Sequence, residues 1–347
     1  NLLASNYKGL KKIIIVDHAS TDGSYEVIKR YARKYSKVQA IRMAKNKTGR
    51  SAEAKNYGAK YVRTELIGFS DADSYPSKDA VKRMIGFFNN PKVGAVTSRV
   101  LVKNRETFIG RLQAIEYKVM AFTRKLMGFV GAIWVTNGPL SIYTRKAFDE
   151  VGGFDESNMT EDIELTWHIV KKGYDVHISL SSVIYTVVPN NFRKWFKQRL
   201  RWNIGGIQTL FKYASSVFRC GMLGLFIIPF FTLSWFLGVS GLFILVYRVI
   251  RILITQYVSV HLSAQAQAAI LSFNDINLAP NILIFYGAIL LVLSLSFTGL
   301  ALIYSKEQDF KRHGLIGVII YMFVYLLAYP IILITSVYKF WRGNYSW

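Results

Sequence analysis

The side chains best placed to do chemistry include three aspartates that follow apolar runs. Asp17 closes "KKIIIVD", while Asp71 and Asp73 come after "LIGF" in "LIGFSDAD". Two carboxylates one residue apart at the carboxyl end of a strand can point into a ligand crevice, where they suit an oxygen-liganded Mg²⁺ or Mn²⁺ shared with a substrate diphosphate. Because aspartate is also common in turns and caps, a structural role stays open for all three.

A fourth aspartate, Asp162, lies in the first turn of a helix predicted from "TEDIELTWHIVKKG". Thr160 is the expected N-cap of this helix. The helix macrodipole favours acids in a first turn, which accounts for Glu161 and Glu164 without any chemistry. Asp162 would act as a general base if the fold held it beside an acceptor hydroxyl, so both a structural and a catalytic interpretation are open.

The stretch "FKQRLRWNIGG", residues 196–206, mixes cations and aromatic rings just before the chain becomes apolar. Arg201 has the forked guanidinium that suits phosphate oxygens. Trp202 offers either a platform for the face of a sugar or an anchor in the headgroup region of a membrane. The surrounding segment, residues 191–221, has the aromatic and cationic character of an amphipathic helix at a membrane surface.

Strands and helices must alternate to position these residues. Apolar runs that end in polar residues predict strands at 11–20, 38–43 and 66–73, and helical signals predict helices at 22–35 and 51–62. This order favours an α/β fold with a parallel, doubly wound sheet. Dinucleotide and phosphate-loop binding are excluded, because neither G-x-G-x-x-G follows the first strand nor G-K-[ST] occurs.

Two further segments have positions that the pattern leaves open. A helix predicted at 108–130 carries apolar residues around much of its circumference, which suits either a helix on the membrane surface or one that caps the core. The opening "NLLASNYKGLKK" looks like the end of a helix that leads into a strand. We therefore expect the natural protein to begin earlier.

Three uncharged apolar segments, 222–246, 281–304 and 315–338, are each long enough to cross a bilayer, which takes about 20 residues. Two alternatives for the topology stay open. The first segment, which contains Pro229, could form a re-entrant hairpin, or the mildly apolar stretch 252–273 could add a crossing.

The net charge of +23 favours binding to an anionic partner. Nucleic acid is excluded as that partner, because the chain has no basic helix fork, zinc-ligand spacing or aromatic RNA-binding strand motif. Anionic membrane lipids and a phosphorylated substrate explain the charge better. Many of the cations lie between Arg193 and Arg219, just before the first apolar segment, so the positive-inside tendency predicts a cytoplasmic location for residues 1–220 of a multi-pass membrane protein.

Four stretches taken together, "IVDHASTDGS", "FSDAD", "VGGFDESNMTED" and "QRLRW", closely resemble the membrane-integrated family 2 glycosyltransferases in order and spacing. That family includes cellulose, chitin, hyaluronan and poly-N-acetylglucosamine synthases. The resemblance implies a cytoplasmic GT-A, Rossmann-like catalytic domain at 1–190, an interfacial segment at 191–221 that carries "QRLRW", and an α-helical transmembrane region at 222–347.

The resemblance also implies roles for the acidic residues. Asp17 would contact the nucleobase, and Asp71 the nucleotide, of a nucleotide diphosphate sugar, here a UDP-sugar. Asp73 would bind Mg²⁺ or Mn²⁺, and Asp162 would be the catalytic base.

The family's Gln, Arg and Trp match Gln198, Arg201 and Trp202. By the resemblance, the first two would hold the donor diphosphate, and Trp202 would stack on the acceptor sugar at the mouth of a membrane channel. The implied reaction is an inverting transfer of a sugar to a growing polysaccharide by a metal-dependent hexosyltransferase.

Some features depart from the family pattern and leave alternatives. His18 stands where a second aspartate is commoner, and Trp347 could be the start of a gate motif. One alternative is the transfer of a single sugar to a membrane lipid or polyprenyl phosphate. Another is a channel or transporter with a cytoplasmic binding domain, which is disfavoured because the apolar segments lack the charged residue that a transport path usually needs.

Overall fold

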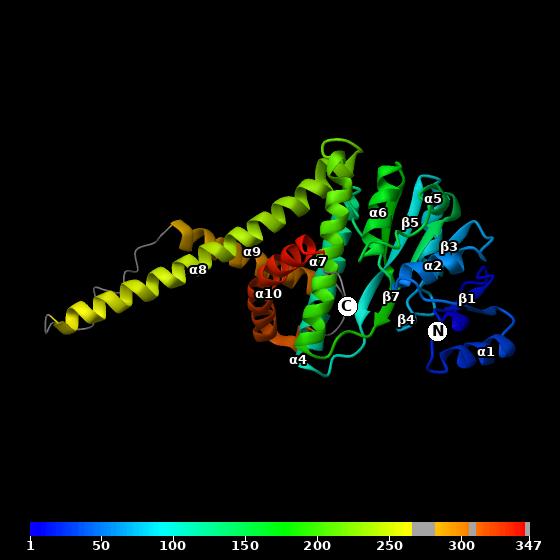
Figure 1. Cartoon of the computed structure of the whole chain (residues 1–347), viewed down its shortest axis with the longest axis horizontal. Helices are drawn as coiled ribbons and strands as arrows, with labels where there is room; N and C mark the ends of the chain where they lie inside the picture. Colours follow the sequence, from blue (N-terminus) through cyan, green and yellow to red (C-terminus); the bar gives the residue numbers. More distant parts are fainter. Residues whose placement is uncertain (266–281, 305–309, 344–347) are drawn as a thin grey trace. The chain divides into compact units, whose positions relative to one another are not determined.

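The structure of the protein is a computed structural model, in which the chain divides into two compact units (Figure 1). The described residues are 1–265, 282–304 and 310–343. One unit comprises Asn1–Phe231 with Thr335–Trp347, and the other comprises Thr232–Ile334. The possible gate residue Trp347 and the last part of the stretch 252–273 lie outside the described residues.

Strands and α-helices follow one another in the order labelled in Figure 1. The described strands are β1 (Ile13–Asp17), β2 (Val38–Arg42), β3 (Leu66–Phe69), β4 (Ser74–Pro76), β5 (Val93–Val102), β6 (Ser141–Thr144) and β7 (Asp175–Thr186). The described α-helices are α1 (Ser24–Lys34), α2 (Ser51–Ala59), α3 (Lys82–Ile85), α4 (Phe108–Phe129), α5 (Arg145–Glu150), α6 (Glu161–Lys171), α7 (Phe192–Tyr213), α8 (Ile228–Gln265), α9 (Ile282–Tyr304) and α10 (Phe310–Trp341).

The strands form two sheets in the first unit. Strands β1 and β2 make a parallel pair, in which Ile13 lies opposite Val38. The other strands form a mixed sheet in the order β3-β6-β5-β7-β4, where only β5 and β7 run parallel. The predicted alternation from β1 through α1, β2 and α2 to β3 is confirmed, and β1 and β2 are parallel as predicted. The prediction of one parallel, doubly wound sheet was wrong, because β3 belongs to the mixed sheet, where it pairs antiparallel with β6.

Strand β5 is the centre of the mixed sheet, between β6 and β7. All of its residues but Arg99 are buried, because helices cover this part of the sheet on both faces. Such a strand shows a nearly continuous apolar run and not an alternating one. Helix α4 packs on β5 and β7 through its buried side, so the predicted helix at 108–130 caps the core, and its location at a membrane surface stays a prediction.

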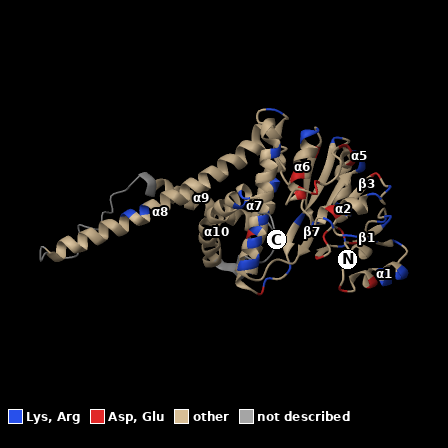
Figure 2. Ribbon diagram, viewed as in Figure 1, with Lys and Arg blue, Asp and Glu red and all other residues tan. Residues whose placement is uncertain are grey.

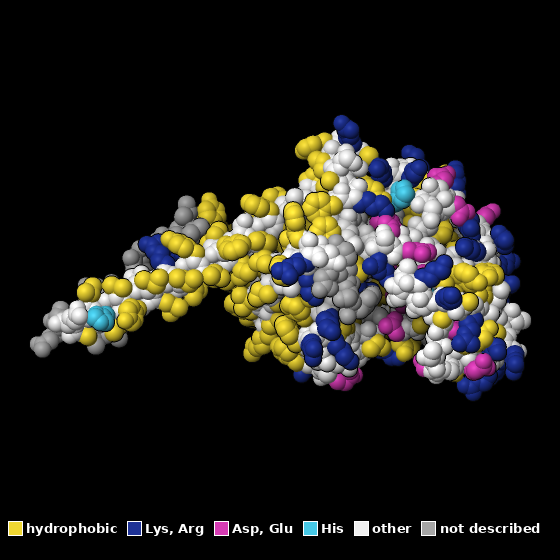
Figure 3. All heavy atoms as spheres, viewed as in Figure 1, with side chains coloured by type: hydrophobic (Ala, Val, Ile, Leu, Met, Phe, Trp, Pro, Cys, Tyr) yellow, Lys and Arg dark blue, Asp and Glu magenta, His cyan; other side chains and the backbone are white. Residues whose placement is uncertain are grey.

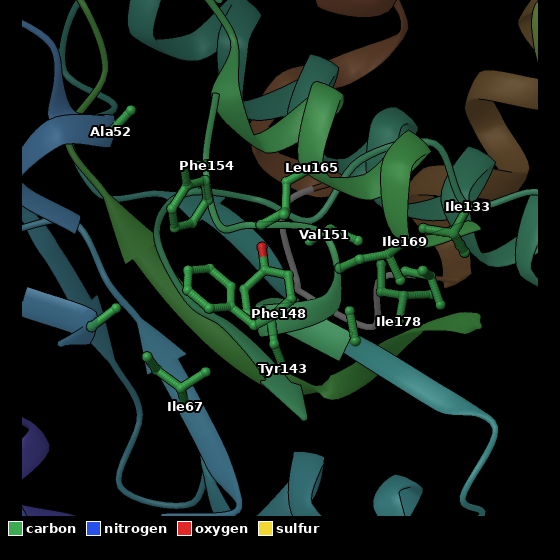
Figure 4. Close-up of a cluster of buried hydrophobic side chains, with 13 residues drawn as sticks. Ala52, Ile67, Ile133, Tyr143, Phe148, Val151, Phe154, Leu165, Ile169 and Ile178 are labelled. Carbon is green, nitrogen blue, oxygen red and sulfur yellow. The ribbon is translucent and has the colours of Figure 1, made fainter. Parts of the chain in front are cut away.

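A cluster of buried hydrophobic side chains that includes aromatic rings forms a core of the first unit (Figure 4). Phe69 at the end of β3 meets Phe154 edge-on, with ring centroids 4.8 Å apart, and Phe148 lies 5.6 Å from Phe154. Leu165 of α6 belongs to the same buried cluster. Buried aromatic pairs of this kind gain roughly 0.5–1.5 kcal/mol beyond their area. The core therefore ties the end of β3 to α6.

Three described helices are long and apolar enough to cross a membrane: Leu223–Gln265, Phe285–Tyr304 and Leu315–Trp341. They agree with the three spans predicted from the sequence. Hydrophobic side chains line most of the visible length of α8, with cations and a histidine among them (Figure 3). Pro229 lies just after the π-helical turn Leu223–Ile227, and the helix continues past it to Gln265. A re-entrant hairpin at 222–246 is therefore not formed, and 252–265 continues the same helix.

Candidate active site

The carboxylate of Asp17, the last residue of β1, is held on one side only. Its Oδ2 lies 3.3 Å from Arg42 Nε and accepts a hydrogen bond from the Ser20 N–H at 3.3 Å. The buried Oδ1 has no hydrogen-bond partner among the described residues. Because an unpaired buried oxygen is costly, Oδ1 is suited to receive an N–H group from a ligand.

Asp71 and Asp73 lie in the turn between β3 and β4. Asp71 Oδ1 is 3.3 Å from Lys55 Nζ. Its other oxygen packs against Gly138, where an added Cβ would lie only 2.6 Å from Oδ2, so a side chain at 138 would displace the carboxylate. Partial burial and the charge of Asp71 raise the pKa of Asp73 above its ordinary value.

The two carboxylates fit a divalent cation that is shared with a ligand. Among the described residues, no group of three or more His, Cys, Asp or Glu side chains could hold a metal ion by itself. Two neighbouring carboxylates that repel each other are nevertheless suited to bind Mg²⁺ or Mn²⁺. The remaining coordination positions of such an ion are commonly taken by phosphate oxygens and water. The residues present therefore fit the metal predicted at Asp73.

Asp162 lies half-buried in the first turn of α6. The Ile163 N–H donates to its Oδ1 at 2.9 Å. Burial raises the pKa of Asp162 to about 6; the charge of Glu161 acts in the same direction, whereas Lys55 and Arg201 oppose it. A carboxylate with this pKa is ionised at neutral pH and is still basic enough to accept a proton in a reaction.

The two glutamates beside Asp162 on α6 accept specific side-chain hydrogen bonds in addition to interacting with the helix dipole. Thr160 occupies the predicted N-cap position, but its side chain makes no capping hydrogen bond. Glu161 accepts a hydrogen bond from Ser51 Oγ at 2.5 Å, and Glu164 accepts one from the Tyr213 hydroxyl at 2.7 Å. The interpretation of both glutamates as acids favoured only by the dipole was therefore incomplete.

Lys55 of α2 is the cation at the centre of these acids. Its Nζ lies 3.0 Å from Glu161 Oε1 and 3.3 Å from Asp71 Oδ1, and its side chain is 13% exposed. Burial alone would lower the pKa of the ammonium group, but the charges of Asp71 and Glu161 outweigh it and hold the pKa above its ordinary value. Lys55 thus connects the β3–β4 turn to the start of α6.

Helix α7 carries the predicted residues Gln198, Arg201 and Trp202, all half-buried. Arg201 is close enough to Asp162 for its charge to lower the pKa of that carboxyl. Arg199 of the same helix contacts both Gln198 and Trp202. Its Nη1 donates to Gln198 Oε1 at 3.0 Å, and its guanidinium carbon is 3.9 Å from the centroid of the Trp202 ring.

The structure brings most of the predicted residues together. Asp71 and Arg201 both act on Asp162, so the β3–β4 turn and α7 meet at the start of α6. Asp73 belongs to the same group of residues, because the charge of Asp71 raises the pKa of Asp73. The described polar contacts of Asp17 run instead to the β1–α1 loop and the end of β2. Carboxylates of different exposure beside buried and half-buried cations suit the binding of a phosphorylated ligand next to a general base.

Residues 1–205 match the model of a family described as glycosyltransferase-like family 2. The chain belongs to this family. The predicted α/β fold of GT-A type is thereby confirmed for this part of the family 2 chain, with the mixed sheet described above.

The family 2 chain is similar to curated bacterial enzymes. It is 30% identical over 223 residues to the poly-beta-1,6-N-acetyl-D-glucosamine synthase of Staphylococcus epidermidis, which covers 63% of this chain and 53% of that protein. It is 28% identical over 232 residues to the synthase of the same name from Staphylococcus aureus strain COL, covering 66% of this chain and 55% of that protein. The chain thus spans about half the length of these relatives.

Among solved structures, the chain is similar to a mannosyltransferase from Pyrobaculum calidifontis in complex with GDP-Man and Mn²⁺. The identity is 22% and the TM-score is 0.48, and the likeness covers 62% of this chain and 58% of that protein.

Sequence reasoning missed two residues of this family 2 site, Lys55 and Arg199. Lys55 sits in "SAEAKNYGAKYV", where a lysine in an amphipathic helix usually faces solvent. Arg199 was treated as one of several interfacial cations, yet its side chain is 0% exposed. The signal available for Arg199 was its spacing, since residue i lies beside residue i+3 on a helix and thus places Arg199 next to Trp202.

Proposed function

We propose that this family 2 chain is an inverting glycosyltransferase that moves a sugar from a nucleotide diphosphate sugar to a growing polysaccharide at a membrane. The observation that carries the proposal is the surroundings of Asp162. This half-buried carboxylate, with its pKa raised to about 6, lies among the charges of Asp71, Lys55 and Arg201. A base beside cations is what proton removal next to a departing diphosphate requires.

In the proposed step, Asp162 takes the proton of an acceptor hydroxyl while that oxygen attacks the anomeric carbon of the donor sugar. The bond from the anomeric carbon to the diphosphate breaks, and the nucleoside diphosphate leaves with the electron pair. Attack from the face opposite the leaving group inverts the anomeric configuration. Arg201 and the amide of Gln198 hold the diphosphate. When bound at Asp73, Mg²⁺ or Mn²⁺ supplies further positive charge to the leaving group.

The environment of Asp17 favours uracil as the donor base. Its Oδ2 is engaged by Arg42 and by the Ser20 N–H, whereas Oδ1 has no hydrogen-bond partner in the part of the chain that the structure describes. Uracil presents a single ring N–H, which one carboxylate oxygen can accept. Guanine presents an N–H and an amino group side by side, which pair best with both oxygens of a carboxylate. The donor is accordingly a UDP-sugar.

The relatives suggest both the sugar and the type of acceptor. The curated proteins that the chain resembles carry the name poly-beta-1,6-N-acetyl-D-glucosamine synthase. UDP-N-acetylglucosamine is therefore the first donor to test, with a glycan as the acceptor. Trp202 provides the ring on which an acceptor sugar would stack.

A membrane location is supported by the three candidate spans and by exposed rings near the ends of α4 and α7. Phe129 is 72% exposed with Lys125 4.5 Å from its centroid, and Phe218 is 78% exposed. Lys and Arg residues also lie along α7 (Figure 2). Rings and cations together are typical of helices in the headgroup region, so we place the catalytic domain on the cytoplasmic face with α4 and α7 at the surface.

The test uses the full chain, purified in lipid nanodiscs, with UDP-N-acetylglucosamine, UDP-glucose and GDP-mannose offered in turn. We expect turnover with a UDP donor, loss of turnover on chelation, and recovery with Mg²⁺ or Mn²⁺. Asp162→Asn should lose transfer by roughly 10²–10⁴-fold but keep donor binding within a few fold.

Asp175→Asn, at an exposed position at the start of β7, is the matched control and should transfer normally. Full turnover in excess chelator would contradict the metal. Equal loss of donor binding and transfer in Asp162→Asn would contradict the assigned base.

A further inference from the structure

Arg199 is the most deeply buried cation of α7. Its side chain is 0% exposed, and its Nη2 is paired with the carboxylate of Glu116 on α4. Glu116 is itself 3% exposed. Removing two charges from water is expensive, and replacing a buried ion pair with apolar side chains is often neutral or stabilising. Stability alone is therefore a weak explanation for this pair.

Two further contacts of Arg199 lead to the residues proposed to bind substrates, Gln198 and Trp202. Its Nη1 donates to Gln198 Oε1 at 3.0 Å, which leaves the amide nitrogen of Gln198 as the donor for a diphosphate. Its guanidinium carbon lies 3.9 Å from the centroid of Trp202 and 5.8 Å from that of Trp195. The guanidinium thus covers one face of Trp202, so an acceptor sugar would stack on the opposite face.

Helix α4 provides a fixed anchor for this arrangement. Besides Glu116, its buried residues include Arg124, whose Nη1 donates to Asn137 Oδ1 at 2.6 Å. The Asn137 side chain in turn donates to the Ser98 carbonyl of β5 at 3.0 Å. A planar, forked guanidinium can pair with a carboxylate at its edge and stack on a ring with its face at the same time. The ammonium group of lysine cannot reproduce both contacts.

We propose that Arg199 is a positioning residue that fixes the orientation of the Trp202 ring by joining it to Glu116 of α4. The consequence for acceptor binding rests on the proposed function, in which Trp202 carries the acceptor sugar. The ion pair itself does not depend on that function. A measurement of ring order can therefore be separated from a measurement of activity.

The test labels the full chain with 5-fluorotryptophan and follows Trp202 by fluorine NMR, with its signal assigned from Trp202→Phe. The variants are Arg199→Met, Arg199→Lys and the double variant Glu116→Met with Arg199→Met. The double variant guards against loss of the fold, because it leaves no uncompensated buried charge, and its Tm should exceed that of Arg199→Met. Lys197→Met, at an exposed position on the same helix, is the matched control.

We expect one sharp Trp202 signal in the wild type and in Lys197→Met, and a broadened or split signal in the double variant and in Arg199→Lys. The KM for a short N-acetylglucosamine oligosaccharide should rise roughly tenfold in these variants, with a smaller change in kcat at saturation, as the loss of one cation–π contact allows. A single sharp signal in the double variant, merely displaced, would overturn the proposal. A broadened signal with an unchanged KM would support positioning but contradict the acceptor role of Trp202.

Discussion

Asp162 combines a half-buried carboxylate with surroundings that raise its pKa to about 6. Because the deprotonated form accepts the proton, activity requires a pH above this value. We predict that kcat/KM falls about tenfold per pH unit below about pH 6 and levels off above it. The check is a pH profile between about pH 5 and 8 with donor binding measured in parallel; a profile that is flat down to pH 5 would exclude Asp162 as the base.

Lys55 is predicted to keep Asp162 ionised, because its ammonium charge lowers the pKa of that carboxyl. Lys55→Met should therefore move the acid limb of the profile to higher pH, whereas Lys55→Arg should leave it close to the wild type. One lost charge contact should move the limb on the order of one pH unit. A reduced rate with an unmoved limb would indicate that Lys55 only supports the fold.

The sequence predicted the acids and the α7 residues of this site but not the cations that organise them. Asp17, Asp71, Asp73 and Asp162 stand beside turn or helix-start signals that can be read locally. The positions of Lys55 and Arg199 depend on burial, which results from how α2, α4 and α7 pack. A local pattern does not contain this information.

Helix α7 passes so close to the start of α6 that only glycine fits at position 205. An added Cβ on Gly205 would lie 2.1 Å from Thr160 Oγ1 and 2.6 Å from the Thr160 backbone nitrogen. Gly205→Ala should therefore push α6 away and displace Asp162, which follows Thr160 by two residues.

We expect Gly205→Ala to cost about 1–3 kcal/mol in the free energy of unfolding and to reduce the transfer rate by on the order of 10²-fold. Gly86→Ala is the control, because a Cβ there meets open space at an ordinary φ of −61°. Thermal unfolding and initial rates of both variants provide the check. Wild-type rates in Gly205→Ala would show that the site does not depend on this close approach.

Element order was predictable and sheet direction was not. The apolar runs and turn residues gave β1, β2 and β3, because those signals are local. The antiparallel pairing of β6 with both β3 and β5 joins residues far apart in the chain, so the alternating pattern of strands and helices did not reveal it. The three helices that are long and apolar enough to cross a membrane were predictable, because length and apolar composition decide them.

The ends of the catalytic unit set a constraint on the membrane topology. Phe340, near the end of α10, stacks on Phe211 of α7 with centroids 5.3 Å apart and planes 6° apart. Three crossings would separate these two rings by the bilayer. We therefore predict an even number of crossings between them.

Single-cysteine labelling tests this prediction, because Cys220 is the one cysteine of the chain. In a Cys220→Ser background, reporters at the exposed positions Arg30 and Arg342 should react with an impermeant maleimide from the same side of membrane vesicles. A reporter at Gln265 should react from the other side, since α8 is 38 residues long, or about 57 Å against a hydrocarbon core of about 30 Å. Labelling of Arg30 and Arg342 reporters from opposite sides would contradict the prediction.

The central claim is that the whole molecule builds a polysaccharide from a UDP-sugar. The most direct measurement incubates the purified full chain in nanodiscs with labelled UDP-N-acetylglucosamine and Mg²⁺ or Mn²⁺, and then sizes the product after extraction with organic solvent. The account predicts a ladder or high-mass glycan in the aqueous phase and none with Asp162→Asn. One sugar on an organic-extractable lipid would contradict polymer synthesis, and the absence of transfer from every nucleotide sugar would contradict the proposed enzyme.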